Sequence, residues 1–197
     1  LREIGEFYKG GMVPRFSPFL VPMMIADIAS GMISMKYGFR GPNYATVSAC
    51  STSNHAMSDA FTLIRMGKAT VVVTGGSEAP INQASIGGFN AARAISTKND
   101  EYMTASRPFD KTRDGFVMGE GAGILVFEDY DLAKARGAKM YAEVGGAGLT
   151  ADAYHITAPH PDGEGARRVM AEAISEAGLT PLDVDYINLH GTSTPLG

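Results

Sequence analysis

Apolar residues recur along the chain at helical spacing in three long segments, and these segments predict helices. A proline or a hydroxyl residue stands near the start of the first two, and a glycine ends each of the three. The predicted long helices cover residues 21–38, 51–67 and 162–178, and a shorter helix is predicted over 131–137.

Five shorter segments are rich in apolar and β-branched residues, a composition typical of buried strands. The predicted strands cover residues 43–49, 69–76, 121–130, 139–151 and 184–190. The run "ATVVVTGG" at 69–76 is nearly continuously apolar, as in parallel strands that are covered on both faces. The order strand, helix, strand over residues 43–76 predicts a βαβ unit.

Helices and strands alternate along most of the sequence, which predicts the α/β class. Two stretches fall outside this alternation: residues 1–19 are expected to be irregular, and residues 80–118 to be rich in loops. A loop as long as the second stretch usually carries function.

Composition and charge exclude several classes of protein. Hydrophobic residues make up 45% of the chain and charged residues 19%, as in ordinary globular proteins. The formal net charge is −4 without a dense Lys/Arg stripe, so we expect no nucleic-acid partner. No apolar run approaches the roughly 20 residues of a membrane span, and no secretory signal opens the sequence. We therefore expect a cytoplasmic protein that does not bind a membrane.

The single cysteine, Cys50, lies where a predicted strand meets a predicted helix. It cannot form an internal disulfide, and no Cys/His cluster has the spacing of a zinc site. One interpretation is a small buried apolar side chain. The other is a nucleophile, because the N–H groups and dipole at a helix N-terminus favour a thiolate and can also hold an oxyanion.

Four histidines could act with such a nucleophile. His55 falls inside the helix that follows Cys50, where a packing role is expected, and His155 and His160 fall in a loop where a solvent-facing role is expected. His190 differs, because it ends an apolar strand and precedes a glycine and three hydroxyl residues. Site residues of α/β folds often lie at such strand ends.

These motifs together resemble one family. The segments "VSACSTSNHA", "TGGSEA", "GGFNAARAISTKND", "ASRPFDKTRDGFVMGEGAGILVFE", "DAYHITAPHPDG" and "NLHGTSTPLG" are similar, in order and spacing, to blocks of the β-ketoacyl-[acyl carrier protein] synthases, and most similar to the synthase II group. The resemblance covers essentially the whole chain.

The resemblance implies the thiolase-like fold, in which two similar α/β halves form α-β-α-β-α layers, usually in a homodimer. Residues 1–138 would belong to the N-terminal half with the nucleophile, and residues 139–197 would begin the C-terminal half with the first catalytic histidine. Members of the family are longer than this chain. We therefore expect a central fragment with an incomplete fold and active site, which would be inactive alone.

The resemblance also implies roles for individual residues. Cys50 would be the acylated nucleophile and His190 the first of two catalytic histidines. The other implied residues contact substrate or carrier: Phe89 and Phe116 near the acyl channel, Thr157 in the substrate pocket, Thr192 and Thr194 at the pantetheine arm, and Arg93 at the docking surface for an acidic carrier.

The implied reaction is a decarboxylating condensation between an acyl group on Cys50 and a malonyl group on acyl carrier protein. It needs no metal or organic cofactor, since the phosphopantetheine arrives on the carrier. Three alternatives remain: a thiolase, a polyketide-type ketosynthase and a non-catalytic partner subunit resembling a chain-length factor. The "HGTSTP" motif disfavours the thiolase, and the presence of Cys50 disfavours the partner subunit.

Overall fold

The contacts of the chain group into two compact units, Leu1–Ala49 and Cys50–Gly197. The computed structural model describes residues 2–13 and 16–196. This grouping divides the chain at a different place from the predicted halves 1–138 and 139–197, which stay a prediction.

The first unit contains three helices among its described residues. They are α1 (Arg2–Lys9), α2 (Leu20–Met24) and α3 (Ile28–Tyr37). The expectation of an irregular segment over 1–19 is wrong for α1, whose Arg2 and Glu6 form an i,i+4 ion pair. The single helix predicted over 21–38 is two helices, because Ile25 adopts an extended conformation. Gly38 ends α3 in the left-handed conformation, as glycine commonly does after a helix.

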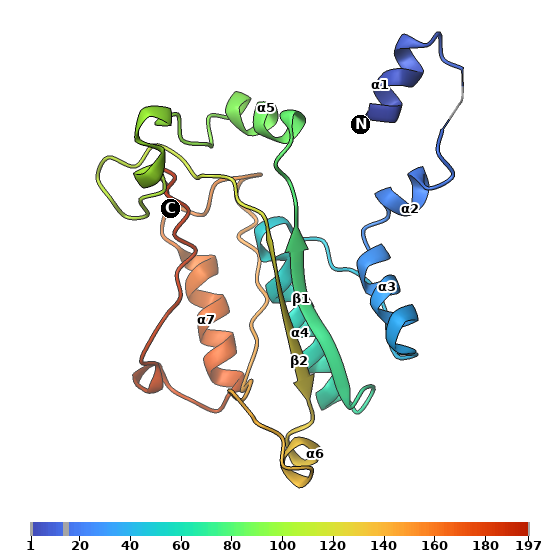
Figure 1. Cartoon of the computed structure of the whole chain (residues 1–197). Coiled ribbons are helices and arrows are strands. Elements are labelled where there is room, and N and C mark those ends of the chain that lie inside the picture. The colour runs from blue at the N-terminus through green and yellow to red at the C-terminus, as the bar shows by residue number, and fades with distance from the viewer. Residues whose placement is uncertain (1, 14–15, 197) are drawn as a thin grey trace. The chain divides into compact units, whose positions relative to one another are not determined.

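The second unit is built around a two-stranded antiparallel sheet (Figure 1). The strands β1 (Val71–Glu78) and β2 (Gly121–Glu128) pair with Val71 opposite Glu128 and Glu78 opposite Gly121. The other elements are helices: η1 (Ala49–Ser51, which begins one residue before the unit), α4 (Thr52–Arg65), α5 (Gln83–Ala91), η2 (Asn99–Thr104), α6 (Tyr130–Ala135), α7 (Glu164–Glu176) and η3 (Pro181–Asp183).

Helix α4 packs on β1 and β2 (Figure 1). The glycines of β1 permit close approach there. A Cβ at Gly76 would lie 2.1 Å from Ser53 Oγ in the first turn of α4. A Cβ at Gly75, where φ is +136°, would lie 2.1 Å from the carbonyl oxygen of Gly123 in β2. The sequence "TGG" therefore places the start of α4, next to Cys50, directly against the sheet.

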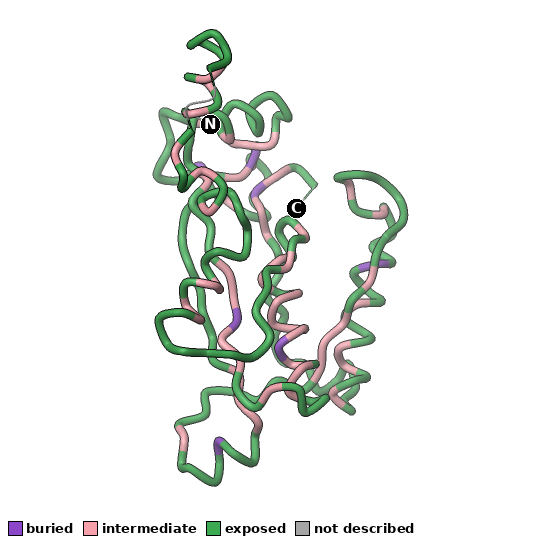
Figure 2. Tube along the Cα trace, turned by 90° about the vertical axis from the view of Figure 1, so that its right-hand side faces the viewer, coloured by how far each residue is buried: buried purple, intermediate pink, exposed green. Residues whose placement is uncertain are grey.

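The sheet differs from the prediction in pairing and in burial. Residues 43–49, 139–151 and 184–190 form no strand, because a strand needs a hydrogen-bonded ladder and these segments have no ladder partner in the described part of the chain. The predicted βαβ unit is therefore absent there. In β1 only Thr74 is buried, so the prediction of a strand covered on both faces is wrong in this structure. Figure 2 shows that buried residues are scattered thinly along the trace.

The predicted loop region 80–118 contains α5 and η2, so it is less irregular than expected. Asn82 begins α5 by accepting hydrogen bonds from the N–H groups of Ala84 and Ser85, as a helix cap does. Gly137 and Gly178 take the left-handed conformation just beyond α6 and α7. The helices predicted over 51–67, 131–137 and 162–178 are confirmed within a few residues at each end.

Candidate active site

Cys50 lies in η1, the short helix that directly precedes α4, and it is exposed. Ala49, which precedes it, has φ of +50°, a conformation that residues with a side chain rarely adopt. A cysteine on a sharp turn before a helix resembles the nucleophile turn of other α/β enzymes. The interpretation of Cys50 as a buried apolar side chain is therefore wrong in this structure.

His190 is also exposed, and it begins the loop 190–195. No hydrogen bond or ion pair joins His190 to Cys50 among the residues that the structure describes. The structure thus places Cys50 in η1 and His190 in a loop, and it shows no direct contact between the two.

Thr192 and Thr194 lie side by side in loop 190–195. Their hydroxyl oxygens are 2.7 Å apart, and Thr192 Oγ1 also accepts a hydrogen bond from the N–H of Thr194. Both residues are partly buried. The two hydroxyls present adjacent hydrogen-bonding groups on the loop that begins with His190.

Phe89 and Phe116 also meet, although 27 positions separate them in the sequence. Their ring centroids are 5.1 Å apart in a T-shaped arrangement. Phe116 is held by a bridge to Ile95, and its N–H donates to the carbonyl oxygen of Ala94. The two rings therefore form an aromatic pair between α5 and the segment that leads to β2.

Arg93 and Thr157 stand apart from these groups. Arg93 follows α5 with φ of +53° and is exposed. Thr157 is exposed, and its N–H donates to Nδ1 of His155, which also accepts from the N–H of Ala158. His155 is thus a local cap of its loop, and His160 binds the Asp162 carboxylate, so both histidines have structural partners.

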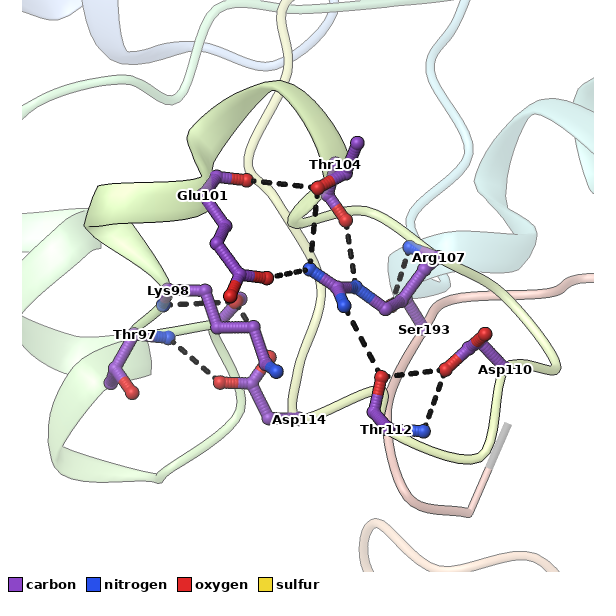
Figure 3. A network of polar contacts seen from close by, with 10 residues as sticks. Thr97, Lys98, Glu101, Thr104, Arg107, Asp110, Thr112, Asp114 and Ser193 are labelled. Carbon is purple, nitrogen blue, oxygen red and sulfur yellow. Dashed lines mark hydrogen bonds and ion pairs between the residues drawn. The ribbon is translucent and has the colours of Figure 1, made fainter.

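Loop 190–195 is anchored by a second loop, residues 107–115, in a network that sequence reasoning missed (Figure 3). The N–H of Arg107 donates to Ser193 Oγ at 3.0 Å, and the N–H of Gly115 donates to the Ser193 carbonyl at 3.0 Å. The Arg113 guanidinium donates to the carbonyl oxygens of Thr194 and Pro195. The sequence signals for this contact are the arginine and aspartate side chains in loop 107–115 and the hydroxyl side chains in loop 190–195.

The anchoring loop is itself fixed by ion pairs and hydrogen bonds (Figure 3). Arg107 pairs with Glu101 at 2.9 Å and donates to Thr112 Oγ1 at 3.2 Å. The hydrogen bond from Arg107, and the charges of Lys98 and Arg107, hold the pKa of Glu101 below its usual value. Hydrogen bonds from Thr112 lower the pKa of Asp110 in the same way. These carboxylates are therefore held in the charged form that the network needs.

A hollow in the second unit lies elsewhere. It has a volume of about 690 Å³ and is lined by residues of α4, α7 and the segment before α7, among them Thr62, Leu149 and Glu172. Neither Cys50 nor His190 lines it.

No group of three or more His, Cys, Asp or Glu side chains among the described residues could hold a metal ion. No helix in the described ranges is long and apolar enough to cross a membrane.

Comparison with known proteins identifies the class to which this fold and site belong. The β-ketoacyl synthase N-terminal domain matches residues 7–133, and the β-ketoacyl synthase C-terminal domain matches residues 141–197. A β-ketoacyl synthase from Burkholderia phymatum is similar over 100% of this chain and 47% of its own, with a TM-score of 0.91 and 36% identity. The chain thus has the thiolase-like α/β fold of the ketosynthases, and it belongs to the β-ketoacyl synthase family.

Two further comparisons show which kinds of β-ketoacyl synthase the chain is similar to. The 3-oxoacyl-[acyl-carrier-protein] synthase 2 of Staphylococcus aureus is 56% identical over 183 residues, which are 93% of this chain and 45% of that protein. A structure of a type II polyketide acyl-carrier protein with its ketosynthase is similar over 95% of this chain and 47% of the matched chain, with a TM-score of 0.90 and 34% identity. The chain spans about half the length of the relatives that it matches.

Proposed function

We propose that the full-length protein is a 3-oxoacyl-[acyl-carrier-protein] synthase of fatty acid biosynthesis. It joins an acyl group held on Cys50 to a two-carbon unit from malonyl carrier protein. The observation that carries the proposal is the exposed Cys50 on a strained turn at the N-terminus of α4. The identity of 56% to a synthase 2 supports the choice of substrate class.

The first half-reaction transfers the acyl group to the enzyme. The Cys50 thiolate attacks the thioester carbonyl of acyl carrier protein, and backbone N–H groups at the start of α4 stabilise the oxyanion. The bond from carbon to the carrier sulfur breaks, and the carrier leaves as a thiol after it takes up a proton. The acyl group is then a thioester on Cys50.

The second half-reaction extends the chain. His190 donates a hydrogen bond to the thioester carbonyl of malonyl carrier protein and stabilises the enolate that forms as the C–C bond to the carboxylate breaks and CO₂ leaves. The enolate carbon attacks the acyl-Cys50 carbonyl and expels the Cys50 thiolate. The product is 3-oxoacyl carrier protein. No step needs a metal or an organic cofactor.

The proposal includes the substrate-contacting groups and the setting. Phe89 and Phe116 border the acyl chain, Thr157 lines the substrate pocket, Thr192 and Thr194 contact the pantetheine arm, and Arg93 contacts the acidic carrier. We place the protein in the cytoplasm, since its single cysteine needs no oxidising compartment. We also propose that it is a homodimer, as the resemblance to the family implies. Sedimentation of the full-length protein tests the dimer.

The experiment follows the acyl group. Full-length protein is incubated with acyl carrier protein that carries an isotope-labelled acyl group, and the adduct is located by mass spectrometry. We expect the label on Cys50, and no label and no condensation in Cys50→Ser, because an alkoxide is far harder to form than a thiolate. Arg136→Gln, on the surface pair with Glu128, is the matched control and keeps both activities. An adduct on another residue contradicts the proposal.

The second candidate is a polyketide-type ketosynthase, which the similarity to a polyketide ketosynthase complex favours. Product analysis with malonyl carrier protein separates the two. A single extension by two carbons supports fatty acid synthesis, whereas repeated extension without reduction supports a polyketide pathway. A full-length protein that forms no adduct at Cys50 in the presence of a catalytic subunit would instead be a partner subunit.

A further inference from the structure

We infer that Ser193 and Arg113 are positioning residues that fix the backbone of loop 190–195 and thereby direct His190 toward the malonyl thioester. The inference rests on the proposed function, since it assigns the two residues to the second half-reaction. It concerns residues that do not touch the substrate themselves.

Ser193 is the buried centre of the loop. It is 0% exposed, and its neighbours Thr192 and Thr194 are partly buried. Its hydroxyl oxygen accepts from the N–H of Arg107, and its carbonyl oxygen accepts from the N–H of Gly115, each at 3.0 Å. A buried polar group without partners is costly, so both bonds hold the residue in place.

Arg113 holds the residues that follow. Its Nε donates to the carbonyl oxygen of Thr194 and its Nη2 to that of Pro195, both at 2.9 Å. Nη1 donates to the carbonyl oxygen of Asp110 at 2.9 Å. The planar guanidinium thus bridges loop 107–115 and loop 190–195 with a fixed fork of donors, which an ammonium group cannot reproduce.

Backbone strain is present at the same contact. Ser193 and Phe109 have φ of +66° each, which residues with a side chain rarely adopt, and Gly191 has φ of +50°, which glycine adopts readily. A Cβ at Gly191 would lie 3.3 Å from the ring of Phe109, so the two loops pack closely. Strained conformations persist where the surroundings fix them from several sides, and they occur often at functional sites. Here the hydrogen-bonded and strained residue, Ser193, lies three positions after His190.

The chemistry explains why such anchoring matters. A hydrogen-bond donor stabilises a developing enolate only when it is aimed at the oxygen before the reaction begins. A misplacement of about 1 Å costs on the order of 10²-fold in rate. Cys50 lies on another element, η1, and has no hydrogen bond to this network in the ranges that the structure describes. Loosening loop 190–195 should therefore slow the second half-reaction and leave the first unchanged.

The test measures the two half-reactions separately in the full-length protein. The variants are Ser193→Gly, which keeps the left-handed conformation and removes the hydroxyl, and Arg113→Lys, which keeps the charge and removes the fork. Labelling of Cys50 reports the first half-reaction, and release of labelled CO₂ from malonyl carrier protein reports the second. Arg136→Gln is the control for loss of a surface guanidinium.

We expect CO₂ release to fall about 10- to 100-fold in both variants. We expect Cys50 labelling to stay within about twofold of the unsubstituted protein, as a change confined to loop 190–195 requires. Ser193→Gly combined with His190→Ala should be no slower than His190→Ala alone, because the serine acts through the histidine. A purely structural role would not give this non-additivity.

Two results would overturn the inference: unchanged CO₂ release in both variants, or an equal loss of both half-reactions together with a lower unfolding midpoint. Failure of the proposed function gives a different result. In that case the unsubstituted protein neither labels Cys50 nor releases CO₂.

Discussion

Arg93 occupies an exposed, left-handed position directly after α5. Its guanidinium makes no hydrogen bond or ion pair within residues 2–13 and 16–196, so its charge is not neutralised by a described neighbour. The proposed carrier is acidic, and charge pairs at the rim of an interface mainly affect association.

Arg93→Glu is expected to raise the KM for acyl carrier protein about tenfold and to leave kcat unchanged, because the substitution turns attraction into repulsion. Salt screens such charges, so the difference should shrink at high ionic strength. Steady-state kinetics at two salt concentrations measures it. Lys68→Glu, which changes the charge equally on another loop, should have a KM close to that of the unsubstituted protein. A loss of kcat at constant KM would contradict the role of Arg93.

At the scale of elements, the segment 145–151 lies against α7 without being a strand. The carboxylates of Glu176 and Glu172 accept from the N–H groups of Ala147 and Leu149. A Cβ at Gly148 would lie 2.1 Å from the carbonyl oxygen of Val169. Helix side chains therefore satisfy the backbone groups of this segment, and glycine permits the close contact.

Gly148→Ala is expected to lower the free energy of unfolding by about 1–3 kcal/mol, because the added methyl group meets backbone that cannot move alone. Urea unfolding of the full-length protein measures the change. Gly119→Ala is the matched control: a Cβ there meets no atom within 4 Å, and an effect within about 0.5 kcal/mol is expected. Equal effects of the two substitutions would show that the contact with α7 is not the cause.

At the scale of the whole molecule, long-range contacts join the two regions that match the two family domains. Arg65 of α4 pairs with Glu176 of α7 at 2.6 Å, and Arg107 binds Ser193. Both pairs lie inside the second compact unit. The anchoring loop therefore stabilises the folded unit as well as loop 190–195.

Acid is expected to weaken this unit. The Ser96 hydroxyl lowers the pKa of Asp114, as Thr112 and Arg107 lower those of Asp110 and Glu101. A lowered pKa means that the folded state binds fewer protons than the unfolded state, so the stabilisation is present at neutral pH and is lost as the pH falls from about 5 to about 3.

The urea midpoint at pH 7 and at pH 4 measures this loss. Asp110→Asn, which keeps an acceptor oxygen and cannot titrate, should lose less stability on acidification than the unsubstituted protein. Asp131→Asn removes a carboxylate on α6 that has no hydrogen bond in the described part of the chain. The Asp131→Asn variant should lose as much stability on acidification as the unsubstituted protein. An equal loss of stability in the unsubstituted protein and in both variants would contradict the prediction.

Local sequence patterns were enough to predict the α/β class, the helix that follows Cys50, the helices over 131–137 and 162–178, and the family. These features depend on residues within a few positions of one another: apolar spacing, caps and the glycine after a helix. The order of motifs along the chain was sufficient to indicate the family, because each motif can be recognised without knowledge of its contacts.

The pairing of the strands and the contacts that hold the loop of His190 could be seen only in the folded chain. β1 pairs with β2 in an antiparallel ladder, and three apolar segments that resemble strands have no ladder partner in the described ranges. The bond between Arg107 and Ser193 joins residues 86 positions apart. Such contacts depend on how distant segments meet in space, and neither the periodicity nor the composition of a local stretch contains that information.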